Sequence, residues 1–456
     1  MKKFVVLLVV VAISCLGTAA FAADIAVSGS IDIRSRDFND LKLNKDAPAE
    51  TAGNTRDTQE RVRLTIDAKA GDVKGRISIE NDWDTWGRLE SKQADGSTST
   101  GESTINGIGQ SILDLREAWI NFNLPGIPVN VNVGHQLLQL GNGWFLRNMK
   151  YGDDAWVVAN VTGANTVAFV DIKALESTLS SSPPTNPSSA SADDIDGYAL
   201  LDVFKLSDTA TVGIDLTSVN DRRATLLGPA PDKSLNLQNV GLNFNGMLGP
   251  VNLKAELDFQ MGKVENISPG NDSKFKGNQI VIQGTIPVDP VTINFTLARG
   301  SGSKVGDTDQ KEMVTILDAD QHYTFLYEYK IGTPGGFNPA SVGVNASKAH
   351  TGFQNTTALS VGVSAQASKS LNVGVDLWYL QATEDVTTTT ATGTTTSNKL
   401  GSEIDAHLNW AMYDNLSWNW QVGYFKPGDA YKNVVAGVET GKDAATGIQG
   451  VLSFKF

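Results

Sequence analysis

A stretch in the middle of the chain alternates strictly between apolar and polar side chains. From Val251 to Met261, every odd-numbered residue is apolar and every even-numbered residue is polar. A period of two places the apolar side chains on one face of an extended strand and the polar ones on the other. A tilted strand of about 9–11 residues is long enough to cross a bilayer. The pattern therefore predicts a membrane-spanning β-strand.

The same alternation recurs along the chain, separated by connections of two kinds. It returns at 61–69, 291–297, 357–367, 371–379, 400–410 and 416–424. Short turns are predicted at 71–72, 125–126, 162–165, 207–208, 248–250, 287–290, 369–370 and 413–415. Long polar loops lie at 39–57, 85–110, 176–194, 221–234, 383–398 and 427–446. Tight turns that alternate with long loops are typical of a transmembrane antiparallel β-barrel.

The number of strands follows from a parity argument. About nineteen segments fit the pattern, but both ends of a single-chain bacterial barrel lie on the periplasmic side, which requires an even number. We therefore expect an all-β barrel of about 18 strands, with 16 to 20 open. The region 311–352 is the uncertain one: Tyr323, Phe325, Tyr327 and Tyr329 predict a strand, and 341–346 leaves another open.

One strand contains a break in its alternation. Leu113 and Leu115 occupy one parity, whereas Ala118 and Ile120 occupy the other. A β-bulge inserts one extra residue and shifts the parity in this way. We predict a bulge near Arg116 and Glu117.

The polar face of each strand is expected to line the interior. A lysine or arginine on the lipid face costs about 2–4 kcal/mol at the bilayer midplane, and a barrel of 16 to 18 strands leaves an aqueous channel. An inverse barrel with an apolar interior is the alternative. The predicted pore-lining residues are Arg34, Arg36, Arg61, Arg63, Lys74 and Arg76. Acidic residues lie among them, so a basic wall and cross-strand ion pairs both remain open.

Aromatic residues near the predicted strand ends indicate an interfacial girdle. They are Trp83, Trp86, Trp378, Tyr379, Trp410, Tyr413 and Tyr424.

The first 22 residues are typical of a secretory signal peptide. Lys2 and Lys3 precede an apolar run over 4–13, and small residues at Ala20 and Ala22 suit cleavage before Ala23. The predicted domains are the signal at 1–22 and a barrel with long external loops at 23–456. The only cysteine, Cys15, lies in the signal, so disulfides and thiolate metal sites are not expected in the mature chain.

Composition and histidine spacing narrow the function classes. With 37 basic and 50 acidic residues the chain is too acidic to suggest a nucleic-acid partner. The four histidines form no metalloprotease or haem motif, so no metal, cofactor or catalytic residue is predicted. Loop charges are screened beyond about 8 Å at physiological salt. Groups at the narrowest point should therefore set ion selectivity, with a weak preference for cations.

Two motifs resemble the bacterial outer-membrane porin family. Glu117-Ala118-Trp119-Ile120 is followed by Val133-Gly134-His135-Gln136 and then Gly141, which is similar to the porin strands that lead into the third external loop. The chain also ends in an alternating strand whose Phe454 and Phe456 resemble the signal read by the barrel-assembly machinery. A terminal strand of this kind must also pair with the first strand, because that removes both sheet edges.

The resemblance implies a function and a constriction. We expect a water-filled channel through which small hydrophilic solutes and ions diffuse across the outer membrane of a Gram-negative bacterium. The expected partners are outer-membrane lipids, the barrel-assembly machinery and the solutes. The resemblance leaves a homotrimer open. Loop 138–154 would narrow the pore, unless it stays outside; its candidate residues are Trp144, Arg147, Lys150, Asp153 and Asp154. A barrel hydrolase and a non-conducting scaffold or adhesin are the alternatives.

Overall fold

The computed structural model describes most of the chain after the predicted signal. The described residues are 24–46, 53–86, 103–105, 108–110, 113–175, 194–221, 235–265, 272–304, 306–317, 322–333, 352–390, 393–435 and 438–456. The predicted signal at 1–22 and the possible strand at 341–346 lie outside them. Within these ranges no helix is both long and apolar enough to cross a membrane.

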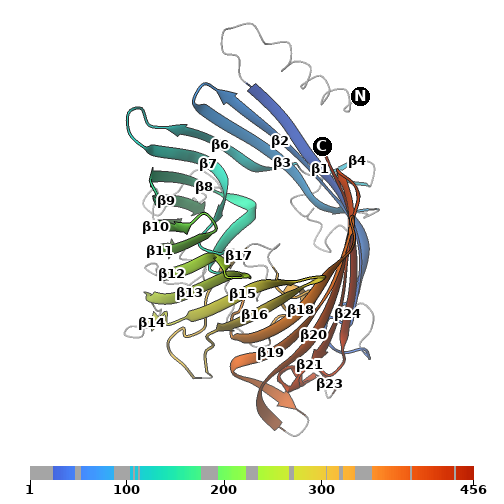
Figure 1. Cartoon of the computed structure of the whole chain (residues 1–456). Helices are drawn as coiled ribbons and strands as arrows, with labels where there is room; N and C mark the ends of the chain where they lie inside the picture. Colours follow the sequence, from blue (N-terminus) through green and yellow to red (C-terminus); the bar gives the residue numbers. More distant parts are fainter. Residues whose placement is uncertain are drawn as a thin grey trace.

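Eighteen long strands form one closed antiparallel barrel (Figure 1). Each strand pairs with its neighbours in the chain, and β24 pairs with β1 from Thr446 opposite Asn39 to Lys455 opposite Ser30. This last pairing closes the barrel and leaves no exposed edge. The strands are β1 (Asp24–Asn39), β2 (Thr55–Ala70), β3 (Val73–Thr85), β6 (Asp114–Asn123), β7 (Val129–Gln139), β8 (Leu146–Thr162), β9 (Asn165–Leu175), β10 (Ile195–Ser207), β11 (Ala210–Asp221), β12 (Leu235–Leu248), β13 (Val251–Val264), β15 (Asn278–Val288), β16 (Val291–Gly300), β18 (Thr356–Ser368), β19 (Leu371–Thr390), β20 (Gly393–Tyr413), β21 (Leu416–Pro427) and β24 (Ala445–Lys455).

Six short strands lie in the connections. They are β4 (Ser103–Ile105), β5 (Ile108–Gln110), β14 (Ser273–Lys274), β17 (Ile316–Leu317), β22 (Asn433–Val435) and β23 (Val438–Thr440). Only β14 and β17 hydrogen-bond to barrel strands.

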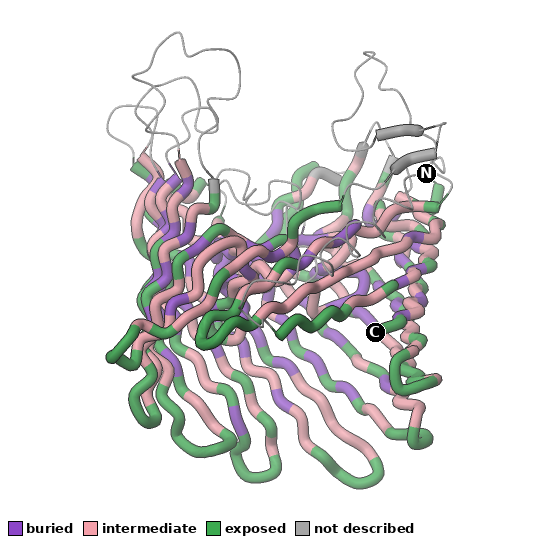
Figure 2. Tube along the Cα trace, turned by 90° about the horizontal axis from the view of Figure 1, so that it is seen from above, coloured by how far each residue is buried: buried purple, intermediate pink, exposed green. Residues whose placement is uncertain are grey.

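The predicted turns and the even strand number are confirmed. Each of the eight short turns joins two neighbouring strands, such as 71–72 between β2 and β3. Figure 2 shows these exposed turns along one rim of the barrel. The predicted bulge is also present, because Ser78 pairs with Glu117 and Ile79 with Leu115, which leaves Arg116 as the extra residue.

The strand predicted from Tyr323 to Tyr329 is wrong. Its residues form bends and a π-helical turn at Tyr327–Ile331. β16 pairs directly with β18, from Val291 opposite Ala365 onwards, so the wall has no place for another strand there. Phe325 and Tyr327 are instead buried in an apolar cluster with inward residues of the wall, and the half-buried Tyr323 and Tyr329 pack against this cluster. Alternation alone does not distinguish a lipid-facing strand from a segment packed against the inner wall.

The two faces of the strands are arranged as the pattern predicts. On β13, Phe259 and Met261 are 48% and 46% exposed, whereas Glu256 and Asp258 are buried. The apolar side chains cover the outside, and the polar ones point into the barrel. This is the reverse of a soluble carrier with an apolar interior.

A charge on the outer face of β13 is expected to destabilise the barrel. Leu257 lies in the middle of this strand and shares its outer face with Phe259. Leu257→Arg should lower the free energy of unfolding in lipid vesicles by about 2–4 kcal/mol. Asn252→Arg, on the inner face, is the control and should have little effect. Equal unfolding free energies for both variants in a urea titration would contradict this orientation.

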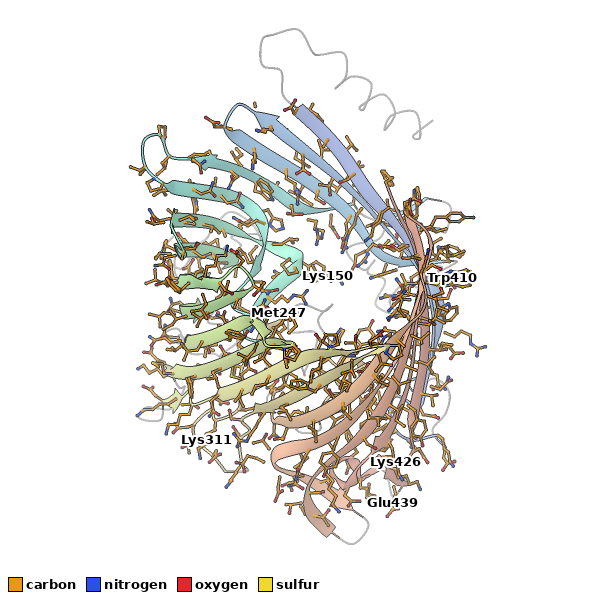
Figure 3. The ribbon with its side chains drawn as sticks, viewed as in Figure 1. Lys150, Met247, Lys311, Trp410, Lys426 and Glu439 are labelled. Carbon is orange, nitrogen blue, oxygen red and sulfur yellow. The ribbon has the colours of Figure 1, made fainter. Side chains whose placement is uncertain are left out.

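The girdle prediction is only partly correct. Trp86, Tyr379, Trp410, Tyr413 and Tyr424 are exposed, and Trp410 lies on the outer side of the wall in Figure 3. Trp83 and Trp378 instead line a cavity inside the barrel. A bulge turns Trp83 inward, whereas Trp378 lies on the same inward face of β19 as Asp376.

Candidate functional site

The predicted pore-lining residues lie on one face of three neighbouring strands. Arg34 and Arg36 come from β1, Arg61 and Arg63 from β2, and Lys74 and Arg76 from β3. Cross-strand register stacks them along the wall: Arg61 is opposite Asp32, Arg63 opposite Glu80, and Arg76 opposite Asp67. Lys74 is exposed beside the turn at 71–72.

Most of these basic side chains form ion pairs across the strands. Arg36 Nε lies 2.6 Å from Asp57, Arg61 Nη2 lies 3.3 Å from Asp32, and Arg76 Nε lies 2.7 Å from Asp67. Arg63 pairs with Glu80. The wall is thus a ladder of paired charges, as in the second of the two interpretations that the sequence left open. Such pairing cancels much of the charge on this wall.

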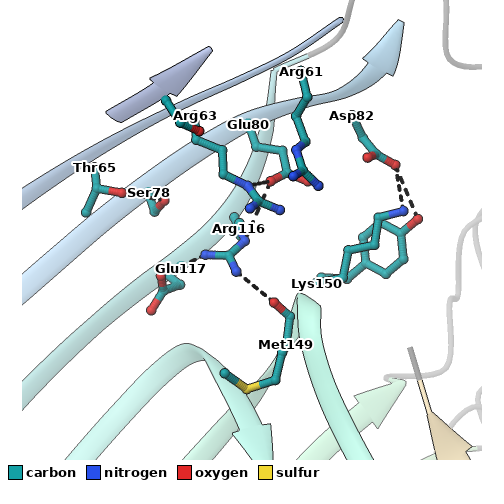
Figure 4. Close-up of polar contacts among 12 residues, drawn as sticks. Arg61, Arg63, Thr65, Ser78, Glu80, Asp82, Arg116, Glu117, Met149 and Lys150 are labelled. Atoms are coloured by element: carbon teal, nitrogen blue, oxygen red, sulfur yellow. Dashed lines mark hydrogen bonds and ion pairs between the residues drawn. The ribbon is translucent and has the colours of Figure 1, made fainter. Parts of the chain in front are cut away.

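The bulge on β6 brings a further arginine into this wall (Figure 4). Arg116 lies 3.2 Å from Glu117 and 3.6 Å from Glu80, and its Nη2 donates to the carbonyl of Met149 at 2.7 Å. Lys150, which points into the barrel in Figure 3, pairs with Asp82 of β3 at 2.9 Å. These contacts fasten the base of the loop between β7 and β8 to the charged wall.

The ring of Trp83 packs against the guanidinium groups of two of the arginines. The ring centroid lies 3.8 Å from the guanidinium carbon of Arg34 and 4.3 Å from that of Arg61. A second bulge, where Glu60 pairs with Asp84 but Val62 pairs with Asn81, turns the tryptophan inward. Its φ of 47° is uncommon for a bulky residue. Backbone strain of this kind concentrates at functional sites.

The loop after β7 folds into the barrel. Gly141 (φ 53°) and Gly143 (φ 86°) reverse the chain, and the tip reaches the inner face of β13. There Glu256 accepts backbone N–H groups from Asn142 at 2.5 Å, Trp144 at 2.9 Å and Phe145 at 3.2 Å. Glu256 is therefore the shared acceptor for the backbone of the tip, and the Asn142 side chain adds hydrogen bonds to two backbone carbonyls of the wall.

The other residues predicted for this loop are divided between several places. Arg147 lines a cavity of about 440 Å³ with Trp144 and Lys254, and Lys150 is held at the loop base. Asp153 lies on β8, outside the tip. Asp154 does not join them: it shares a face of β8 with the exposed Trp156 and contacts His135 at 2.8 Å, with its side chain 70% exposed. Neighbouring strand residues point to opposite faces, so Asp154 turns away from the interior.

A second segment lies inside the barrel, which the sequence pattern did not reveal. It belongs to the connection between β16 and β18, described at 301–304, 306–317, 322–333 and 352–355. Within it, β17 pairs in parallel with the start of β8, and Ile316 N donates to Phe145 O at 2.7 Å. Tyr323 stacks on Phe353 at 4.1 Å, and Trp144 packs on Phe353 at 4.8 Å. The two inward segments thus touch each other.

The charged wall and the second segment enclose a chamber of about 430 Å³. Arg34, Arg61 and Trp83 line one side, and Asp376 and Asp405 are among its other lining residues. Charged, amide, hydroxyl and aromatic groups surround this space, so it suits water, ions and small hydrophilic solutes. Among the residues that the structure describes, no cluster of three or more His, Cys, Asp or Glu could hold a metal ion.

Comparisons with known proteins match this architecture. No protein-family model and no curated sequence matches the chain. Solved structures do match: Pseudomonas aeruginosa OccK8 (OprE), P. aeruginosa OpdK with vanillate, and a BenF-like porin from Pseudomonas fluorescens. They share 10%, 10% and 11% sequence identity, cover 95%, 94% and 96% of this chain and 98%, 98% and 100% of their own, and each has a TM-score of 0.52.

The chain has the fold of an outer-membrane porin. The structural likeness shows the porin fold. At this low sequence identity it assigns no role to any side chain. The roles of the charged wall and of the two inward segments rest on their geometry.

Proposed function

We propose that this porin-fold chain forms a diffusion channel for small hydrophilic solutes and ions in the outer membrane of a Gram-negative bacterium. One observation carries the proposal: a polar chamber lies inside a closed barrel whose outer face is apolar. An apolar band on the outside suits the bilayer, and a polar interior suits a water-filled passage. The loop tip at Glu256 and the second inward segment narrow this passage.

The channel is expected to select weakly among ions. Cross-strand ion pairs neutralise much of the charge on the arginine wall. The net charge of the chain is −13, but salt screens the charges that lie more than about 8 Å from the passage, so only a weak preference for cations is expected. One of the matched porins was crystallised with vanillate, a small carboxylate. Small organic acids are therefore useful test solutes beside sugars.

This function implies several partners. Outer-membrane lipids would cover the apolar face, and the barrel-assembly machinery would read Phe454 and Phe456. A homotrimer would bring three such channels together.

Planar-bilayer recording of the purified protein tests the proposal. We expect stepwise conductance in KCl, with a reversal potential displaced slightly toward that of potassium under a salt gradient. Liposome swelling should show entry of small sugars and organic acids and exclusion of larger oligosaccharides. A reversal potential displaced toward that of chloride would contradict the cation preference.

Two other outcomes would favour the alternatives. Complete absence of conductance from folded protein would favour a scaffold or adhesin. Hydrolysis of phospholipid or peptide by the purified barrel would favour a hydrolase.

A further inference from the structure

The second inward segment is fastened to the wall opposite β17 by a buried carboxylate. Glu403, on the inner face of β20, accepts the backbone N–H groups of Leu326 at 2.6 Å and Tyr327 at 2.7 Å. Asp405, two residues further along β20, accepts that of Phe325 at 3.3 Å. Glu403 is only 1% exposed. Three consecutive peptide groups are thus held by one strand.

A pair of glycines makes room for the segment at the same place. Gly423 of β21 and Gly447 of β24 are direct neighbours in the sheet. A Cβ atom on Gly423 would lie 2.7 Å from the ring of Phe325, whereas one on Gly447 would lie 2.6 Å from the ring of Phe38 and 2.9 Å from Leu326 Cδ2. These distances are shorter than side-chain packing tolerates. The two glycines form a socket for Phe325 and Leu326.

Hydrogen bonds of two tyrosine hydroxyl groups also hold the segment. Tyr327 Oη lies 2.6 Å from the hydroxyl of Thr333 and 2.7 Å from that of Thr356. Burial raises the pKa of Tyr327 to about 12, so the phenol remains neutral. Tyr431 donates its hydroxyl to the carbonyl of Gly332 at 2.6 Å. The segment is therefore built into the wall and is more than a loop lying in the lumen.

The docked segment lines part of the passage. His322, Tyr323, Thr324 and Phe325 all line the chamber of about 430 Å³. Tyr323 also reaches the tip of the other inward loop, since its ring centroid lies 6.3 Å from that of Trp144. A displacement of the segment would widen the chamber and remove support from the loop tip at the same time.

We propose that Glu403, with the socket of Gly423 and Gly447, is the anchor that holds segment 322–333 in the lumen and so sets the width of the passage. Glu403 is a positioning residue: it lies beneath the segment and acts through it. This role in setting the width of the passage rests on the proposed channel function.

Single-channel recording of anchor variants tests the proposal. A glutamine at position 403 offers only one acceptor oxygen, and its amide N–H group faces the backbone donors. Glu403→Gln and Gly423→Ala should each release the segment and raise the KCl conductance by roughly twofold or more, because the open pore widens. Two controls should keep the wild-type conductance. Glu265→Gln removes a carboxylate outside the lumen contacts, and Gly75→Ala adds a Cβ with nothing closer than 3.5 Å.

A second readout follows the segment without depending on conductance. Ala445 is fully buried in the same apolar cluster as Leu326. In a chain carrying Cys15→Ser and Ala445→Cys, the new thiol should resist a charged methanethiosulfonate reagent. Adding Glu403→Gln should make it reactive.

The two readouts separate the possible failures. Unchanged conductance and an unreactive thiol in Glu403→Gln would overturn the anchor while leaving the channel intact. A reactive thiol in a protein that never conducts would support the anchor and refute the channel function. A rise in conductance with Glu265→Gln equal to that of Glu403→Gln would also overturn the proposal, since any lost carboxylate would then suffice.

Discussion

Removal of Phe456 is expected to reduce the amount of assembled barrel more than any other single change at the chain ends. Phe456 makes both of the last hydrogen bonds of the seam: its carbonyl accepts from Gly29 N at 2.9 Å, and its N–H donates to Gly29 O at 3.1 Å. Two backbone hydrogen bonds contribute about 1–3 kcal/mol. The deletion also removes the residue expected to be read during assembly. Both effects act on closure, so heat-modifiable monomer in outer-membrane fractions should fall sharply.

A variant on the other side of the seam provides the check. A Cβ on Gly29 would lie 2.6 Å from the ring of Phe456 and 2.5 Å from the backbone oxygen of Arg63. Gly29→Val should therefore disturb the pairing of β1 on both sides while leaving the terminal signal intact, and its purified protein should refold less well in detergent. If deletion of Phe456 left both the assembled yield and the refolding unchanged, neither the seam nor the signal would depend on this residue.

Glu256→Ala is expected to have the largest effect on the size of the passage at the first inward loop. The substitution leaves three backbone N–H groups at 142, 144 and 145 without their shared acceptor. Each hydrogen bond of this kind contributes about 0.5–1.5 kcal/mol. The loop tip should leave the wall, and single-channel conductance and the swelling rate with larger sugars should both rise.

The second inward segment limits how far this opening goes. A deletion of residues 141–150 removes the tip and its contact with β17, but Glu403 still holds segment 322–333 at the opposite wall. We therefore expect the deletion combined with Glu403→Gln to conduct more than either change alone. Asp208→Asn, at a short turn away from both segments, is the control. Equal conductance in wild type and in the 141–150 deletion would show that the loop tip does not narrow the pore.

Much of the wall follows from local sequence. A membrane barrel exposes apolar side chains outside and polar ones inside, so each strand must alternate, as 251–261 does. Tight turns need particular residues, and all eight were predicted from them. The bulge at Arg116 was also visible, because one inserted residue shifts the parity of every residue beyond it.

The contents of the barrel do not follow from the same pattern. Tyr323, Phe325, Tyr327 and Tyr329 alternate like a lipid-facing strand, yet Phe325 and Tyr327 are buried inside. The acceptors that hold the inward segments, Glu256 and Glu403, look in the sequence like any other lumen-facing carboxylate. Trp83 has the sequence position of a girdle residue, and only a bulge turns it onto the arginines.

The sequence by itself thus determined the barrel, its strand parity, its turns and the inward direction of its charges. The tertiary structure alone decided which segments fill the lumen and which carboxylates hold them. The physical reason is the range of the interactions. Alternation is a local response to lipid on one side and water on the other, whereas Glu403 meets Leu326 and Glu256 meets Trp144 across more than seventy residues of chain. Contacts of that range depend on how the closed barrel brings distant strands and loops together.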